Sequence, residues 1–228
     1  MKKKILLIGN DDGLPGVKVD LRNYKEYFKS DRGGRWYDSE IIEKLNPRKS
    51  DLIQEIISLT AQKLDYLIVI FSGHGGQERE TVFELNSSGE IINESVLFDI
   101  STKQLNIYDC CRAYSESNTK SIRLTALMEG YAYNYVRTRF EERILKASDQ
   151  QIKLYACSKG EVANDTSQGG AYSKNLIKSA YNSSSEFILV GSAHTSASEM
   201  TNQEFPKQHP DAILPRLLSS QQLIFGIN

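Results

Sequence analysis

The chain has 228 residues, of which 39% are hydrophobic and 25% are charged, and its formal net charge is −1. This length fits one large domain or two small ones, and the composition is that of an ordinary globular protein. The balanced charge argues against a nucleic-acid or membrane-surface partner. The first apolar run, at 5–8, is too short for a signal-peptide core, and no stretch approaches the length of a membrane span.

Short apolar, β-branched runs alternate with segments of helical periodicity through the first part of the chain. These runs predict buried strands of a parallel sheet, joined by right-handed crossovers with helices on both faces. After the third strand the pattern changes to a β-hairpin over 81–92, with its turn at 86–89. The strands are expected at 4–8, around 40–44, and at 67–71, 104–108 and 152–156. The helices are expected over 17–29, 124–147 and 171–181, and a further helix is expected to begin after Ser50 as its N-cap and to reach residue 59.

The segments between and after these elements are less regular. Residues 113–121 and 158–170 lack a clear periodicity and are expected to form loops. The stretch 187–200 fits either a strand or a helix, and 223–227 predicts a closing strand at a sheet edge.

The chain has only three cysteines, Cys110, Cys111 and Cys157. Two of them are adjacent, which makes a poor disulfide framework. This usage indicates a reducing, cytoplasmic setting in which a free thiol survives as a nucleophile.

Two of the predicted strands end in turns that carry reactive side chains. The strand at 67–71 leads to His74 between glycines, and the strand at 104–108 leads to Asp109, Cys110 and Cys111. Chemistry in open α/β sheets gathers outside the carboxyl ends of the strands, so we expect a histidine and a thiol at one edge. An imidazole can take the proton of a thiol, and the thiolate then attacks a carbonyl. Successive residues leaving a strand face opposite ways, so only one of the two cysteines can face His74.

These motifs resemble the caspase-fold cysteine peptidases, and among them the metacaspases and their bacterial relatives. Members of that family are similar in having one apolar strand that runs into Ser-Gly-His-Gly and a second that runs into Asp-x-Cys. Where metacaspases follow the cysteine with His-Ser, this chain has Arg112-Ala113. The matching segments, in chain order, are 72–76, 109–111, Cys157, 169–170 with 172–173, and 220–223.

The resemblance implies an α/β chain with the caspase-hemoglobinase fold, a mainly parallel six-stranded sheet flanked by helices on both faces. It implies a single peptidase domain over 1–228, with a p20-like part at about 1–122, a p10-like part at about 148–228 and no prodomain.

The same resemblance assigns catalytic roles. It points to Cys111 as the nucleophile and to His74 as the general base, or as the partner of a preformed ion pair. The backbone N–H groups of Gly75 and Cys111 are the expected donors to the oxyanion. The alternative is that both cysteines are small core residues and that His74 is a turn residue without a catalytic role.

The substrate pocket follows from the resemblance as well. Asp20, Ser72 and Asp109 resemble the residues with which metacaspases bind an Arg or Lys side chain before the scissile bond. Two carboxylates in one pocket repel each other unless a cation arrives. The alternative roles are a helix-start carboxylate for Asp20 and a structural hydrogen-bond acceptor for Asp109.

Many metacaspases need calcium, which takes roughly six to eight oxygen ligands. The corresponding region offers Asp99, with Glu90 and Glu94 nearby and Asn118 past the cysteines. This set is too small for such a site, so no calcium, other metal or cofactor is expected.

The resemblance implies a peptide or protein substrate, a bacterial regulatory or defence setting, an activating partner protein and a monomeric state. Basic residues between the Cys111 and Cys157 strands are candidate sites of self-cleavage, or else one charged face of a helix. These residues are Arg137, Arg139, Arg143 and Lys146.

Two other functions are compatible with parts of the chain. Some caspase-fold proteins are inactive scaffolds, but here both dyad residues are present. The run Asn10-Asp11-Asp12-Gly13 also resembles the start of the SurE-type nucleotidases, with Asp11 and Asp12 as metal ligands. In that family the later Ser-Gly is followed by Asn, whereas here it is followed by His74.

Overall fold

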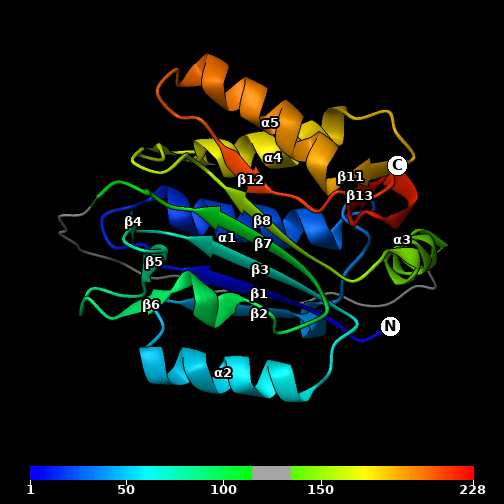
Figure 1. The fold of residues 1–228 in the computed structure, drawn as a ribbon, viewed down its shortest axis with the longest axis horizontal. Coiled ribbons are helices and arrows are strands. Elements are labelled where there is room, and N and C mark those ends of the chain that lie inside the picture. The colour runs from blue at the N-terminus through cyan, green and yellow to red at the C-terminus, as the bar shows by residue number, and fades with distance from the viewer. Residues whose placement is uncertain (115–134) are drawn as a thin grey trace.

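The computed structural model describes residues 1–114 and 135–228 and is organised around one six-stranded sheet (Figure 1). The strand order is β12-β8-β7-β3-β1-β2, in which β12 pairs antiparallel with β8 and every other pair is parallel. The predicted fold class is confirmed. The strands are β1 (Lys3–Gly9), β2 (Ile41–Leu45), β3 (Tyr66–Ser72), β7 (Lys103–Asp109), β8 (Gln150–Tyr155) and β12 (Asp211–Ile213).

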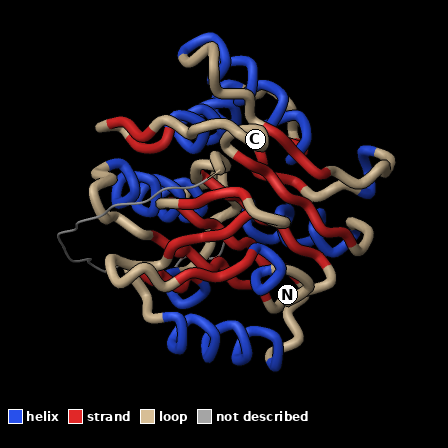
Figure 2. Tube along the Cα trace, turned by 60° about the vertical axis from the view of Figure 1, so that its left-hand side comes forward, coloured by secondary structure: helices blue, strands red, loops and turns tan. Residues whose placement is uncertain are grey.

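Helices cover both faces of this sheet (Figures 1 and 2). Side chains alternate along each strand, so Ile5 and Leu7 of β1 share a core with α1, α3, α4 and α5, while Leu6 and Ile8 pack with α2. The central strands β1 and β3 are buried on both sides, which explains their continuous apolar runs. The helices are α1 (Gly16–Lys29), α2 (Lys49–Ala61), α3 (Tyr135–Lys146), α4 (Ala171–Asn182) and α5 (Val190–Glu204).

The predicted hairpin is confirmed and forms part of a separate three-stranded sheet. Its strands are β5 (Thr81–Glu84) and β6 (Ile91–Asn93), and β5 also pairs with β4 (Gly75–Gln77). β4 begins directly after His74, so the histidine lies where the chain leaves the main sheet for the small one. A 3-10 turn, Glu94–Leu97, follows β6.

The sixth strand of the main sheet is not the one that the sequence predicts. The predicted closing strand at 223–227 forms as β13 (Ile224–Ile227), but it pairs with β11 (Phe187–Leu189) in a sheet of its own. The edge position is taken by β12, which has three residues and no buried side chain. So short and exposed a strand carries no periodic pattern.

The ambiguous stretch at 187–200 contains both elements, because β11 ends at Leu189 and α5 begins at Val190. The predicted loop at 158–170 includes a small hairpin of β9 (Asp165–Thr166) and β10 (Gly169–Gly170). Residues 115–121 of the predicted loop and 124–134 of the predicted helix lie outside the described residues.

The predicted N-cap Ser50 is wrong. α2 begins at Lys49, and Ser50 lies in its first turn, where its hydroxyl donates to the Asp51 carboxylate at 3.2 Å. The helix start is instead capped from a distant segment, because the Lys49 N–H donates to a Glu90 carboxylate oxygen at 3.2 Å. A carboxylate beside a helix N-terminus also complements the helix dipole.

The basic residues of α3 are held in a folded helix. Arg137 and Arg139 form ion pairs, and Arg143 is buried and donates to the Ser219 carbonyl oxygen at 2.6 Å. A peptidase binds its substrate as an extended chain. These contacts therefore favour the interpretation of the basic residues as one face of a helix over their interpretation as self-cleavage sites.

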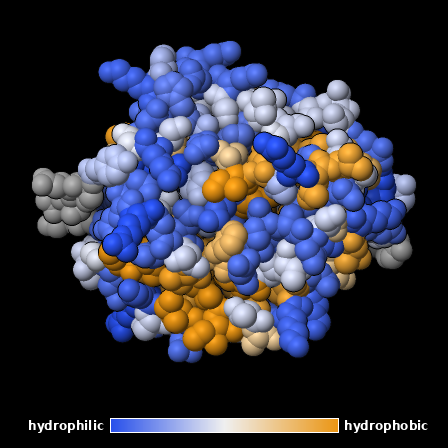
Figure 3. Space-filling model, in the orientation of Figure 1, coloured by the Kyte–Doolittle hydropathy of each residue, from blue (hydrophilic) through white to orange (hydrophobic). Residues whose placement is uncertain are grey.

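Within the described residues, no helix has both the length and the apolar character needed to cross a membrane. The surface seen in Figure 3 is mostly hydrophilic, with hydrophobic residues gathered over its lower part, where Figure 1 places α2. Among the residues of α2, Ile57 has an exposed side chain.

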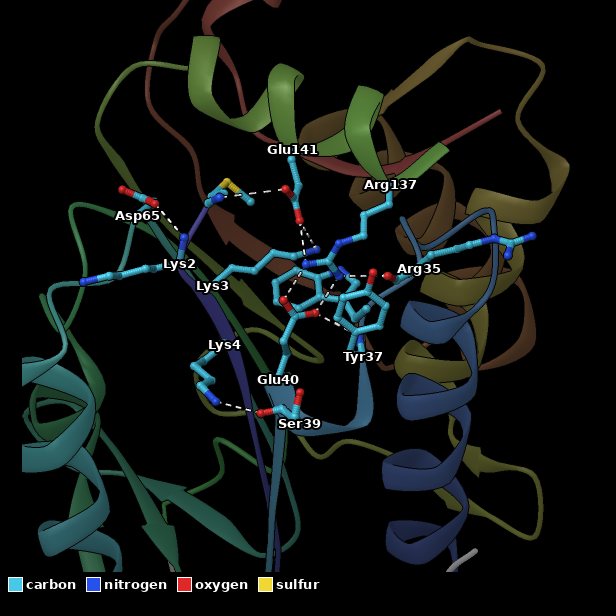
Figure 4. A network of polar contacts seen from close by, with 12 residues as sticks. Lys2, Lys3, Lys4, Arg35, Tyr37, Ser39, Glu40, Asp65, Arg137 and Glu141 are labelled. Carbon is cyan, nitrogen blue, oxygen red and sulfur yellow. Dashed lines mark hydrogen bonds and ion pairs between the residues drawn. The ribbon is translucent and has the colours of Figure 1, made fainter. Parts of the chain in front are cut away.

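A polar network joins α3 to the N-terminal strand (Figure 4). The buried Lys3 ammonium lies 3.3 Å from Glu141 and 4.0 Å from the centre of the Trp36 ring. Arg137 binds Glu141 at 2.7 Å and Glu40 at 2.6 Å. Glu40 ends the 3-10 turn Asp38–Glu40, which precedes β2. Burial lowers the pKa of Lys3 to about 8, although both glutamates raise it.

The lowered pKa gives the stability of the protein a pH dependence. Between about pH 8 and 10.5 the unfolded state binds more protons than the folded state, so stability rises with pH there. Across this window, we expect the free energy of unfolding of the wild type to increase by about 3 kcal/mol relative to that of Lys3→Met. Urea unfolding at pH 7, 9 and 10.5 measures this, with the exposed Lys2→Met as control. Parallel pH curves for the wild type and Lys3→Met would contradict it.

Candidate active site

The pairing of β3 with β7 brings the two predicted catalytic residues to one edge of the sheet. Ser72 at the end of β3 lies opposite Asp109 at the end of β7, and the Gly73 N–H donates to the Asp109 carbonyl oxygen at 3.1 Å. His74 and Cys111 follow these two residues by the same number of positions. Both of their side chains line the same two adjoining cavities.

Close backbone packing explains the glycines on either side of the histidine. Gly73 has φ of +153°, and a Cβ there would lie 3.0 Å from backbone atoms of Asn10. At Gly75 a Cβ would lie 2.7 Å from the sulfur of Cys110. Both positions therefore need glycine for the histidine turn to pack against the first strand and against the cysteines.

The backbone N–H of Gly75 points away from its own sheet. The Glu84 N–H donates to the His74 carbonyl oxygen at 3.0 Å, which makes these two a hydrogen-bonded pair of the antiparallel ladder. Such pairs alternate with non-hydrogen-bonded ones, so Gly75, opposite Phe83, directs its N–H to the open side of β4. The same side faces the cysteine turn, because the Gln77 N–H donates to the Ala113 carbonyl oxygen at 3.1 Å.

One ring nitrogen of His74 is fixed by a backbone carbonyl. Its Nε2 lies 2.5 Å from the carbonyl oxygen of Asp12. A carbonyl can only accept a hydrogen bond, so Nε2 carries a proton. In the neutral ring this leaves Nδ1 as the nitrogen that can accept a proton from a thiol.

The two adjacent cysteines have different surroundings. Cys110 is 2% exposed and packs in the core with α2, whereas Cys111 is partly exposed and its sulfur lies 3.8 Å from the Ala163 carbonyl oxygen. Burial raises the pKa of the Cys111 thiol, and the Asp109 charge adds to the rise. A thiol with a raised pKa needs a base to ionise it at neutral pH, a role that the neighbouring imidazole can fill.

The first cavity, of about 220 Å³, is acidic. Its lining includes Ser72, His74, Cys111 and three carboxylates, those of Asp20, Asp109 and Asp165. None of its described lining residues is Lys or Arg. The Ser72 hydroxyl donates to Asp20 at 2.7 Å, and the Gly170 N–H donates to the same carboxylate at 2.9 Å.

Backbone donors also hold the second buried carboxylate. The Ser173 N–H donates to Asp109 at 2.9 Å. A Cβ at Gly170 would lie 2.3 Å from an oxygen of Asp109, and one at Gly169 would lie 2.3 Å from an oxygen of Asp20. The glycine pair therefore lets the backbone approach both carboxylates, which explains the Gly-Gly segment before α4.

The environment of these carboxylates favours their neutral forms. Burial, together with the charge of Asp109, raises the pKa of Asp20 well above its ordinary value. Burial also raises the pKa of Asp109 to about 6, against the opposing effect of the Ser173 hydrogen bonds. The pKa of Asp165 is raised as well, again by burial. A cation entering the cavity relieves this cost, because it stabilises the charged carboxylates.

Asp165 is a cavity residue that the sequence analysis missed. Its carboxylate accepts a hydrogen bond from the Gly16 N–H at 3.1 Å. This contact joins the start of α1 to a loop far along the chain, and no local spacing reveals it. The available signal was an acidic side chain four positions before the Gly169-Gly170 pair.

Arg112 occupies the position at which the chain departs from the metacaspase pattern. Its side chain is buried, stacks 3.9 Å from the centre of the Tyr155 ring and donates to the Cys157 carbonyl oxygen at 3.2 Å. It also pairs with Asp211 of β12 at 3.3 Å. Arg112 therefore fixes the turn that carries Cys111 to the neighbouring strands.

Within the described ranges, no group of three or more His, Cys, Asp or Glu side chains is arranged to hold a metal ion. Two residues considered for calcium have protein partners: Glu90 binds Asn86 at 2.7 Å, and Glu94 accepts from Tyr155 at 2.8 Å. Asp11 of the nucleotidase-like motif is paired with Lys18 and with Asn46.

Comparison with protein families decides the classification. The family model of the caspase domain (Peptidase_C14) matches residues 2–213. The chain belongs to the caspase domain family. This membership supports the predicted resemblance to caspase-fold peptidases and removes the basis for the nucleotidase interpretation. A comparison with curated proteins finds no match.

Solved structures show the same fold. A crystal structure of caspase-1 from Spodoptera frugiperda matches with a TM-score of 0.67, covering 99% of this chain and 90% of that chain at 14% sequence identity. At this identity the likeness concerns the fold alone. The caspase domain therefore provides the scaffold on which His74, Cys111 and the acidic cavity are placed.

The buried carboxylates predict a measurable cost to stability. The pKa of Asp109 is raised in the folded state, so its contribution to stability is present below about pH 4 and is lost as pH rises through about 6. Between pH 4 and 7.5, we therefore expect the unfolding free energy of Asp109→Asn to increase by about 2 kcal/mol relative to that of the wild type. Chemical unfolding at both pH values measures this. The exposed Asp99→Asn is the control, and equal pH dependence in Asp109→Asn and the wild type would refute the expectation.

Proposed function

We propose that this caspase domain is a cysteine endopeptidase that cleaves after Arg or Lys, with His74 and Cys111 as its catalytic pair. One observation carries the proposal: the cavity that adjoins both side chains holds three carboxylates and no cation among its described lining residues. A guanidinium or ammonium group supplies the missing charge. Ser72 provides a hydroxyl on the wall of the same cavity.

The proposed reaction uses the groups already placed around the dyad. His74 Nδ1 takes the proton from Cys111, and the sulfur attacks the carbonyl carbon of the scissile peptide bond. The resulting oxyanion is stabilised by the N–H groups of Gly75 and Cys111. The imidazolium then gives its proton to the leaving amine as the C–N bond breaks, leaving a thioester. Water attacks the thioester with His74 again as base, which releases the acid product and restores the thiol.

The proposal also covers the cellular setting and the regulation of the enzyme. We infer a monomeric cytoplasmic enzyme in a bacterial regulatory or defence system, with a basal activity that a partner protein raises and without a calcium requirement. The alternative is a caspase-like scaffold that binds its partner without cleaving it. The presence of both dyad side chains beside a substrate-sized cavity favours the peptidase.

Peptide hydrolysis tests the catalytic pair. With fluorogenic peptides ending in Arg, Lys or Asp, we expect cleavage after Arg and Lys only, with and without calcium. Cys111→Ala should abolish it, by a factor of about 10³ or more, because the nucleophile is lost. Cys110→Ala is the matched control and should retain activity, since that sulfur packs in the core. Preference for Asp would overturn the acidic-cavity assignment, and activity that survives in Cys111→Ala would overturn the nucleophile.

Asp165 should contribute to selection of the cation. We expect Asp165→Asn to lower kcat/KM for an Arg peptide about tenfold, the scale of one charge-assisted hydrogen bond. The matching peptide with citrulline, the neutral isostere of arginine, should change little. An equal loss for both peptides would assign Asp165 a structural role at its hydrogen bond to the Gly16 N–H.

A further inference from the structure

A second cavity, of about 380 Å³, lies on the other side of the dyad. It shares His74, Cys111 and Val162 with the acidic cavity, but its remaining wall comes from the small sheet and from the segment after the cysteines. The small sheet follows His74 directly, and Figure 1 shows β4, β5 and β6 together beside the carboxyl ends of the main strands. The two cavities therefore flank the reacting atoms.

Exposed apolar side chains gather around this second cavity. Ile91 is 43% exposed, Val162 56% and Tyr114 74%, and all three line it together with Val82. Exposed large apolar residues are ordinary when scattered singly, but a group of them beside a cavity marks a binding surface. Since the cavity opens onto the catalytic sulfur, its occupant is part of the substrate.

The direction of the proposed reaction identifies which part of the substrate occupies the second cavity. In the proposed mechanism the residue before the scissile bond places its side chain in the acidic cavity, and His74 protonates the amine that leaves. The departing residue therefore lies on the histidine side of the sulfur. His74 borders both cavities, but the residues that follow it, Gly75 and Gly76, line only the second cavity, together with residues of the small sheet.

We propose that the second cavity binds the residue that immediately follows the scissile bond and that it selects a large apolar side chain there. This inference rests on the proposed peptidase function. Burial of a large apolar side chain stabilises a complex more than an ion pair with a solvent-exposed carboxylate does. The apolar wall thus decides what binds, and the lining carboxylates of Glu78 and Glu84 act by repelling acidic residues.

Internally quenched peptides test this inference. All carry Arg before the scissile bond, and the next residue is Leu, Ala or Glu. We expect kcat/KM to be about tenfold higher for Leu than for Ala, the scale of discrimination in an apolar pocket, and lowest for Glu. Ile91→Ser should reduce the Leu preference to near unity. Ile57→Ser is the matched control, an isoleucine 56% exposed on α2, and should keep the preference.

Several other results of this experiment would overturn the inference or one of its steps. Equal rates for Leu and Ala in the wild type overturn this inference while leaving cleavage after Arg intact. A second peptide series varies the residue before the Arg, and a preference for Leu that appears only in that series overturns the assigned direction. If Ile91→Ser keeps the Leu preference, the cavity is not the selecting surface. Absence of cleavage after Arg in every peptide refutes the proposed function and this inference with it. Circular dichroism of both variants verifies that they are folded.

Discussion

The parallel pairing of β3 with β7, with Ser72 opposite Asp109, is the constraint on which the rest of the site depends. This pairing fixes where each of the two strands ends, and so places a histidine and a thiol the same number of residues beyond one edge of the sheet. A shift of one residue would turn Cys111 toward the core and Cys110 toward the cavity, because side chains alternate. The buried apolar residues of both strands hold this register against such a shift.

The acidic cavity shows how function opposes stability in this chain. Burying Asp20 and Asp109 together is costly, since each raises the free energy of the other's charged form. The chain reduces the cost with backbone donors from Gly170 and Ser173, but none of the described residues that line the cavity is Lys or Arg. A structural ion pair would have stabilised the fold and filled the cavity. Under the proposed function, the carboxylates are thereby left free to bind a substrate cation.

Much of the sheet could be predicted because its signals are local. Apolar runs such as 67–71 mark buried strands, and glycines beside His74 mark a turn with close backbone packing. The features that were missed depend on contacts distant in sequence. Asp165 reaches the site through Gly16, α2 is capped by Glu90, and β12 joins the edge through pairing alone. The carbonyl that orients His74 carries no sequence signal, because every residue has one.

The network around Lys3 has a consequence for the integrity of the chain. α3 begins the C-terminal part of the described structure, and Arg137 and Glu141 tie it to β1 and to Glu40 without a covalent link. The pairing of β7 with β8 joins the same two parts again. A chain broken anywhere between Tyr114 and Tyr135 would therefore remain one particle on a native sizing column. Its two fragments would separate only in denaturant.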